Sequence, residues 1–213
     1  MTKRIAILAV LVALAVALAG CGIKPPIQWD ETEERARVLE AMNGWVDGVE
    51  AYNVDAMAGN GILAAGFELT IKEGSSSGYT KDAAVLKSEL NADAGNQAEY
   101  RKPANGYVLR LDIDNAAGVV GYDDVNAWTI VSINKTNAEV VGKFEVYEKA
   151  AVRPTWWQSD TGNIEVTLVR TPNAWKMTNM TIKFDVFGTL ALGTVVPEIE
   201  GFAFGNPRAI FGW

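Results

Sequence analysis

The chain of 213 residues contains no histidine. This absence excludes the Ser-His-Asp triad, zinc sites built on imidazole and the side chain that most often carries protons near neutral pH. Cysteine is almost absent too: the chain contains one, Cys21. A single Cys forms no disulfide within the chain, so an exported protein with this one thiol needs another use for it.

Basic residues are scarce as well. The chain has 19 Lys and Arg against 26 Asp and Glu, a formal net charge of −7 at pH 7, and its Lys and Arg form no cluster. Such a surface is poorly suited to phosphate backbones, so the composition predicts no nucleic-acid partner. Anionic lipid would also repel it, so charge does not hold the protein at a membrane.

The first twenty residues have the layout of a secretory signal peptide. Lys3 and Arg4 give a positive start, and Ile5 to Ala19 run without a charge. This apolar run of about fifteen residues is shorter than the roughly twenty that a membrane-spanning helix needs. The sequence therefore predicts a signal at residues 1–20 that is removed, which would move the net charge from −7 to −9 with the loss of two positive charges.

Leu18-Ala19-Gly20-Cys21 resembles the lipobox of bacterial lipoproteins. In that family the signal is cut before the Cys, whose thiol and new amino group are acylated. The resemblance implies a lipid, palmitate included, on Cys21 and a cell-envelope location. Because Gly22 rather than Asp follows, it also implies an outer-membrane protein facing the periplasm in a Gram-negative cell. Residues 21–29 are then the lipidated Cys and a short tether.

Helical periodicity begins at Asp30, where acidic residues suit a helix N-terminus. The sequence predicts a second short helix capped by Asp55, a strand over 67–72 and a third helix from Lys81 to Leu90 capped by Thr80, followed by a polar loop to Gly106. The first helix carries one apolar stripe, made of Val38, Leu39, Met42, Trp45, Val46, Val49 and Tyr52.

From Tyr107 onward the apolar period is two, which indicates strands. The later strands are expected over 128–133, 139–147, 163–170 and 174–185, with the last two joined by a hairpin at Thr171-Pro172-Asn173. A bulge near Thr178-Asn179 would bring the apolar residues of the final strand to one face. The order predicts an α+β domain over residues 30–186, with helices packed on a curved antiparallel sheet. Residues 187–213 form a tail rich in Gly and aromatics.

Three segments resemble the nuclear transport factor 2-like superfamily, which includes SnoaL-like cyclases, over roughly residues 30–186. They are Asn53-Val54-Asp55-Ala56-Met57 before the second helix, the strand Phe67-Glu68-Leu69 followed by a Gly-rich turn and Thr80-Lys81-Asp82, and Trp175-Lys176-Met177-Thr178 near the end of the sheet. The resemblance implies a half-open cone around an apolar pocket. Its expected ligand-binding residues are Trp45, Tyr52, Tyr107, Leu109, Trp128, Phe144, Leu168 and Trp175, although large apolar strand residues more often fill a core.

The sequence predicts no catalytic group, cofactor or metal. Enzymes of the superfamily that lack His would need a Tyr-Asp pair, yet Asp112 and Asp114 have the opposite strand parity to Tyr107. The oxygen-rich stretch Asp112, Asp114, Asp123, Asp124 and Asn126 lacks the oxygen ligand and the Gly that a calcium loop would have at 116 and 117, so these acids are expected in solvated turns. Gly59-Asn60-Gly61 with Gly66 does not have dinucleotide-binding spacing.

Two adjacent tryptophans, Trp156 and Trp157, are expected in a loop, as a lid over the cone or as a contact for a partner. The sequence thus favours a lipid-anchored envelope protein whose cone-shaped, non-catalytic domain binds an apolar small molecule, a peptide or an envelope protein. Two alternatives stay open. One is an isomerase, cyclase or hydrolase on the same fold, which a buried acid beside a Tyr in the pocket would favour. The other is a structural subunit of an envelope assembly.

Overall fold

A computed structural model describes residues 29–73, 78–114, 127–151 and 153–185. The predicted signal, Cys21, most of the tether and the tail 187–213 lie outside the described residues, as do Asp123, Asp124 and Asn126. Among the helices that are described, none is long and apolar enough to cross a membrane.

The first described helix, α2 (Glu31–Ala51), forms where the sequence predicts it. Its first turn carries three acidic residues, whose negative charge interacts favourably with the positive end of the helix dipole. The predicted stripe is confirmed, with Val38, Met42, Val46 and Val49 at most 1% exposed. The helix ends because Tyr52 adopts a left-handed backbone with φ of 51°, and the Asn53 N–H then donates to the Gly48 carbonyl.

The two following helices differ from their predicted starts. Asn53, not Asp55, caps α3 (Val54–Ala58): its side chain accepts hydrogen bonds from the backbone N–H groups of Asp55 and Ala56. Asp82, not Thr80, caps α4 (Ala83–Tyr100) by accepting from the Val85 N–H. Helix α4 also runs ten residues beyond the predicted end at Leu90.

The predicted polar loop after Leu90 is therefore wrong as far as Tyr100. Its polar side chains bond along the helix instead of breaking it: Asn96 and Gln97 both donate to the Asp93 carboxylate. Gln97 is buried, at 3% exposed, so this polar segment has an inner face.

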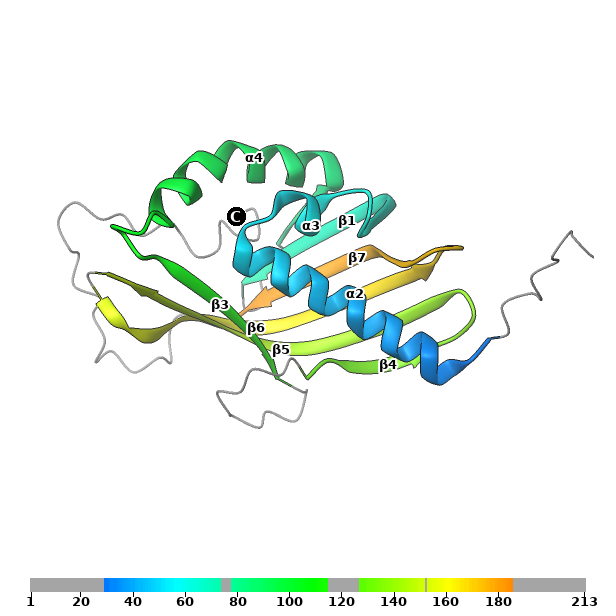
Figure 1. The fold of residues 1–213 in the computed structure, drawn as a ribbon. Helices are drawn as coiled ribbons and strands as arrows, with labels where there is room; N and C mark the ends of the chain where they lie inside the picture. Colours follow the sequence, from blue (N-terminus) through cyan, green and yellow to red (C-terminus); the bar gives the residue numbers. More distant parts are fainter. Residues whose placement is uncertain (1–28, 74–77, 115–126, 152, 186–213) are drawn as a thin grey trace, which may run out of the picture. The chain divides into compact units, whose positions relative to one another are not determined.

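In the part of the chain that the structure describes, seven strands form one sheet: β1 (Leu63–Glu73), β2 (Tyr79–Asp82), β3 (Val108–Asp114), β4 (Thr129–Ile133), β5 (Asn137–Ala150), β6 (Arg153–Arg170) and β7 (Trp175–Phe184). The order is β2-β1-β7-β6-β5-β3, and β4 also pairs with β5. All pairings are antiparallel except β1 with β7, which are parallel and so depart from the purely antiparallel prediction. Figure 1 shows the curved sheet with the helices packed against it.

The predicted hairpin and bulge at the end of the sheet are confirmed. The N–H of Thr171 donates to the Ala174 carbonyl, and the β6–β7 register shifts between Thr167 and Leu168 so that Thr178 is the extra residue. The bulge brings both halves of β7 onto one face, and these apolar residues are buried: Trp175, Met177, Met180, Ile182 and Phe184.

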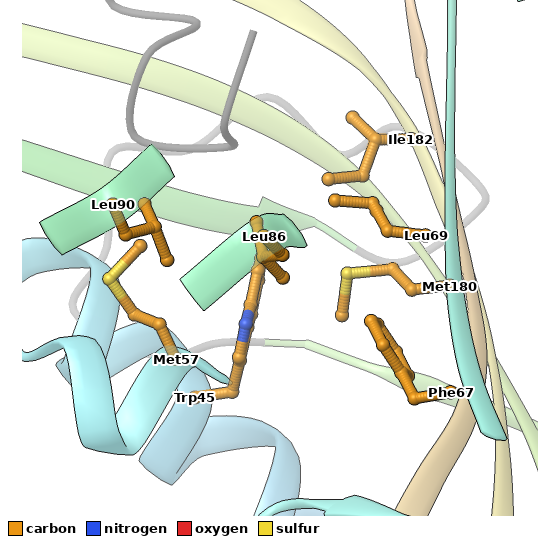
Figure 2. Close-up of a pocket in the computed structure, with 8 residues that line it drawn as sticks. All are labelled: Trp45, Met57, Phe67, Leu69, Leu86, Leu90, Met180 and Ile182. Carbon is orange, nitrogen blue, oxygen red and sulfur yellow. The ribbon is translucent and has the colours of Figure 1, made fainter. Parts of the chain in front are cut away.

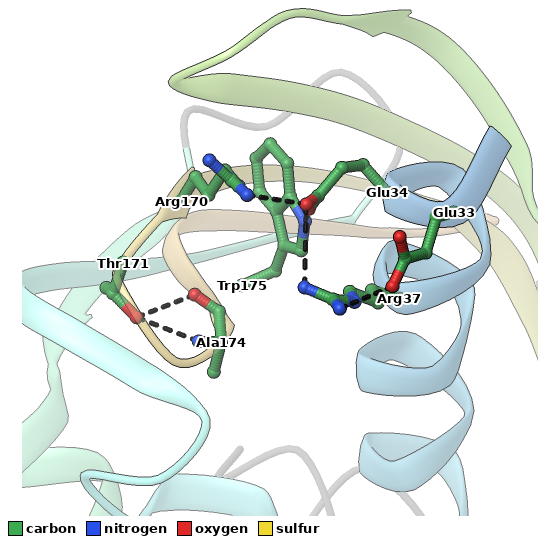
Figure 3. Close-up of polar contacts among 7 residues, drawn as sticks. All are labelled: Glu33, Glu34, Arg37, Arg170, Thr171, Ala174 and Trp175. Carbon is green, nitrogen blue, oxygen red and sulfur yellow. Dashed lines mark hydrogen bonds and ion pairs between the residues drawn. The ribbon is translucent and has the colours of Figure 1, made fainter. Parts of the chain in front are cut away.

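One buried carboxylate ties the start of α2 to the β6–β7 hairpin (Figure 3). Glu34, 2% exposed, accepts from Arg170 Nη2 at 2.6 Å and from Trp175 Nε1 at 2.8 Å. Burial would raise the pKa of Glu34, but these two hydrogen bonds and the charges of Arg170 and Arg37 outweigh it and lower the pKa. Trp175 is thus held by a polar contact as well as by packing.

Candidate binding site

The space between the helices and the sheet is filled by side chains. The apolar cavity there has a volume of about 10 Å³, roughly what one water molecule needs. Figure 2 shows side chains from α2, α3, α4 and the sheet converging on it. The lining residues are Trp45, Met57, Phe67, Leu69, Leu86, Leu90, Met180 and Ile182.

The predicted ligand-binding residues mostly belong to this packed interior. Seven of the eight are buried, and Tyr52 is half-buried. Gly142 and Gly162 let two of their rings lie close to the backbone, because a Cβ at these positions would meet Trp128 at 3.2 Å and Phe144 at 2.8 Å. Trp45 lines the small cavity, and Leu109 lines a separate groove. Their role in ligand binding stays a prediction. The full set is Trp45, Tyr52, Tyr107, Leu109, Trp128, Phe144, Leu168 and Trp175.

Glu148, a buried acid on strand β5, lies beside Tyr107. The Tyr107 hydroxyl donates to Glu148 Oε1 at 2.5 Å, and Glu148 is 2% exposed. Burial first, and then the Glu148 carboxylate, raise the pKa of Tyr107. The Arg101 guanidinium lies 5.8 Å from the ring centre of Tyr107. As the parity argument predicts, Asp112 faces elsewhere and pairs with Arg110.

Tyr52 and Asp93 form a second polar pair, beside α4. The Tyr52 hydroxyl donates to the Leu90 carbonyl at 3.0 Å and approaches the Asp93 carboxylate at 3.3 Å. Burial and Asp93 together raise the pKa of Tyr52. Tyr52 therefore ties the end of α2 to α4, and both tyrosines keep their protons at neutral pH.

An open groove lies between the last turns of α2 and strand β3. We call it the β3 groove and define it by its lining residues; its volume is about 370 Å³. The residues are Asp47, Glu50, Val108, Leu109, Arg110, Leu111, Asp112 and Trp156. Its walls are thus mixed, with three carboxylates, one guanidinium and apolar side chains.

Glu50 joins the two walls of the β3 groove. Its Oε1 accepts a hydrogen bond from the Leu111 backbone N–H at 2.9 Å. Burial raises the pKa of Glu50, and the nearby Asp47 and Asp112 raise it further, against the Leu111 N–H and Arg110, which lower it. This carboxylate therefore lies among charges of both signs, because the guanidinium groups of Arg110 and Arg101 are also nearby.

The predicted tryptophan loop is a strand. Both residues lie in β6, which begins at Arg153, ten residues before the strand predicted over 163–170. Trp156 is half-buried and lines the β3 groove, and the Lys149 ammonium lies 4.5 Å from its ring centre. The side chain of Trp157 lies outside the described part of the structure.

Sequence reasoning did not identify Glu34, Glu50 or Glu148 as special. Their partners lie 141, 61 and 41 residues away, so the residues beside them in sequence give no signal of these contacts. The described residues hold no group of three or more Cys, Asp or Glu arranged to bind a metal ion.

No protein-family profile matches the chain, and no curated protein sequence matches it. Solved structures do match. Aln2 from a Streptomyces species shares 14% identity over 74% of this chain and 94% of that one, with a TM-score of 0.53.

Two further structures are similar to a comparable degree. An NTF2-like protein with a cystatin-like fold from Novosphingobium aromaticivorans has a TM-score of 0.52 at 14% identity, covering 75% of this chain and 86% of that one. The β subunit of the benzoate 1,2-dioxygenase from Burkholderia mallei has a TM-score of 0.53 at 9% identity, covering 75% and 93%. Identities this low show the fold alone, and the predicted fold is confirmed: the described domain has the nuclear transport factor 2-like α+β fold.

Proposed function

We propose that the protein is a lipid-anchored envelope protein whose nuclear transport factor 2-like domain is a non-catalytic module that binds a protein partner in the β3 groove. One contrast carries the proposal: the interior cavity holds about 10 Å³, whereas the groove holds about 370 Å³. We therefore expect a partner to bind in the β3 groove rather than in the interior cavity.

The lipid anchor rests on Leu18-Ala19-Gly20-Cys21 and on the absence of any other Cys. We expect wild-type protein, but not Cys21→Ser, to incorporate labelled palmitate and to partition with the membrane fraction. A Cys21→Ser protein that still enters the detergent phase as the wild type does would overturn the anchor. It would leave the groove unaffected, because Cys21 precedes the domain.

The groove is tested by position-specific photo-crosslinking in intact cells. Val108 lines the groove and is 40% exposed; Val85 on α4 and Val131 on β4 are 44% and 59% exposed and serve as controls. A photoreactive residue at 108 should give a discrete adduct that is absent at 85 and 131. Equal adducts at all three positions, or none at 108, would contradict binding at the groove.

The enzyme alternative retains one supporting observation, the buried Tyr107–Glu148 pair. Neither residue lines the interior cavity or the β3 groove. A structural role is also compatible with the fold, since one of the similar structures is a dioxygenase β subunit. Binding without turnover is the function that the geometry favours.

A further inference from the structure

We propose that Asn60-Gly61, in the exposed turn between α3 and β1, is a site of spontaneous deamidation, and that Lys176 directs the reaction toward isoaspartate. The inference goes beyond the proposed function and does not depend on it. The chain contains three Asn-Gly pairs, at 43–44, 60–61 and 105–106. Their surroundings in the fold differ, and the middle pair leaves its reacting groups accessible.

An Asn side chain deamidates when the backbone nitrogen of the next residue attacks its Cγ. A bond forms between this nitrogen and Cγ, the Cγ–Nδ2 bond breaks, and ammonia leaves with the proton that the backbone nitrogen gives up. The product is a succinimide ring. A following Gly favours the step, because it has no Cβ to hinder the approach and gives the backbone wide conformational freedom. In a folded protein, a hydrogen bond from that backbone N–H opposes the attack.

The turn at Asn60 leaves the attacking nitrogen accessible. Asn60 and Gly61 are both exposed. The turn is closed by the Ile62 N–H, which donates to the Gly59 carbonyl at 3.1 Å. Within the described residues the Gly61 N–H donates no hydrogen bond. A Cβ placed at Gly61 would meet nothing within 4 Å, so there is open space around this residue.

The other two pairs are held by the fold. The pair at 43–44 lies inside α2, where the helix engages the backbone N–H groups. In the pair at 105–106, the Gly106 N–H donates to the Lys102 carbonyl at 2.8 Å. The Asn105 side-chain amide donates to the Glu99 carbonyl at 2.9 Å. Because attack at either pair requires local unfolding first, we expect both to react more slowly than Asn60.

Lys176, on β7, lies at the position that decides how the succinimide reopens. Its ammonium donates to the Asn60 main-chain carbonyl at 2.5 Å. In the succinimide this carbonyl is one of the two that water attacks. Attack there breaks the bond to the Gly61 nitrogen and leaves the former main-chain carbon as a free carboxylate, so the chain continues through Cγ as isoaspartate. Attack at Cγ gives aspartate instead.

The charge of Lys176 favours the first of these two attacks. A cation beside a carbonyl stabilises the negative charge that develops on the oxygen when water adds. The carboxylate formed at the main-chain carbon then replaces the neutral carbonyl as the partner of Lys176, and a hydrogen bond becomes an ion pair. The modification adds one negative charge and one methylene group to the main chain just before β1.

The test incubates the full mature chain in a non-ionic detergent and follows each Asn-Gly pair by tandem mass spectrometry. Methylation by an isoaspartyl methyltransferase distinguishes isoaspartate from aspartate. We expect product at 60 while 43 and 105 stay intact, and faster reaction at mildly alkaline pH, because the attacking nitrogen must lose its proton. In urea all three pairs should react alike. Equal rates at the three pairs in the folded protein, or no product at 60 while the unfolded chain reacts, would overturn the site.

Gly61→Ala tests the attack by the backbone nitrogen. The added Cβ has room, so the fold should be unchanged, while the methyl group hinders the attack and most of the product at 60 should be lost. Gly95→Ala, where a Cβ also meets nothing within 4 Å, is the control and should leave the product unchanged. An unchanged rate in Gly61→Ala would overturn the proposed first step.

Lys176→Met tests the direction of ring opening. The isoaspartate share of the product at 60 should fall and the aspartate share should rise, because the cation beside the main-chain carbonyl is lost. Lys183→Met removes an exposed ammonium from the same strand and should leave the shares as in the wild type. Equal shares in Lys176→Met and the wild type would overturn the role of Lys176.

Discussion

The indole of Trp175 donates a hydrogen bond to Glu34 at 2.8 Å, across 141 residues of sequence. The same carboxylate accepts from Arg170, so one side chain of α2 satisfies two donors from the last hairpin of the sheet. We expect Glu34→Gln to lower the free energy of unfolding by about 1–3 kcal/mol, because a charged acceptor is replaced by a neutral one at a buried site. Chemical denaturation measures this.

Glu33 provides the control for that substitution. Its carboxylate pairs with Arg37 one turn along the helix, and both side chains are about half exposed. Glu33→Gln should therefore change stability by no more than about 0.5 kcal/mol. Similar losses in both variants would contradict a special role for Glu34.

The pH dependence of stability follows from the lowered pKa of Glu34. A carboxyl group whose pKa is lower in the folded state stabilises the fold above its unfolded pKa and loses this contribution as the pH falls through its folded value. Wild-type stability should thus decline below about pH 4.5, the ordinary value for Glu, and Glu34→Gln should show a shallower decline. Parallel acid unfolding curves would contradict this assignment.

Two glycines should respond to alanine in opposite directions. A Cβ at Gly162 would lie 2.2 Å from the Lys183 carbonyl oxygen, whereas at Gly95, on α4, it would meet nothing within 4 Å. Gly162→Ala should cost about 1–3 kcal/mol through overpacking, while Gly95→Ala should stabilise by about 0.5–1 kcal/mol through helix propensity. Thermal unfolding of the two variants tests both; a neutral Gly162→Ala would contradict the packing.

Local patterns predicted the regular elements well. The stripe of α2 has a helical period, and the mismatch of parity in β7 required the bulge at Thr178. Such features are encoded within a few residues of each other. Helix α4 was predicted too short because Asp93, Asn96 and Gln97 look like loop residues, while in the fold they bond to one another.

The candidate site was less accessible to sequence reasoning. Its key contact joins the side chain of Glu50 to the backbone of Leu111, 61 residues away, and only the packing of α2 against β3 brings them together. Strand parity correctly excluded Asp112 as the partner of Tyr107. It could not identify Glu148, because Glu148 comes beside Tyr107 only through the register of β3 against β5. Long-range register is set by the whole sheet, not by neighbouring residues.

Tyr107→Phe removes the donor to the buried Glu148. We expect a loss of about 1–3 kcal/mol in the free energy of unfolding. Because the pKa of Tyr107 is raised in the fold, its hydroxyl stabilises the protein below about pH 10 and this contribution declines above that value. The variant should therefore lose less stability than the wild type between neutral and alkaline pH. Tyr100→Phe, whose ring contacts Tyr107 edge-on at 6.3 Å, is the control.

The last prediction separates recognition from folding at Trp156. This side chain is half-buried, lines the β3 groove and supports the Lys149 ammonium 4.5 Å from its ring centre. Trp156→Ala should weaken the adduct formed from the photoreactive residue at position 108, because the apolar wall of the β3 groove is lost. Its melting temperature should stay close to that of the wild type.

Trp175→Ala gives the contrasting case, since that indole is 3% exposed and bonded to Glu34. Truncating a core Trp typically costs about 3–5 kcal/mol, so this variant should lose much of its stability. The melting temperature and the yield of the position-108 adduct are measured on both variants. If Trp156→Ala unfolds as readily as Trp175→Ala while its folded fraction still gives the adduct normally, Trp156 belongs to the core and is not a recognition contact of the groove. If Trp156→Ala weakens binding while its melting temperature stays unchanged, the partly exposed indole serves recognition and does not contribute to stability.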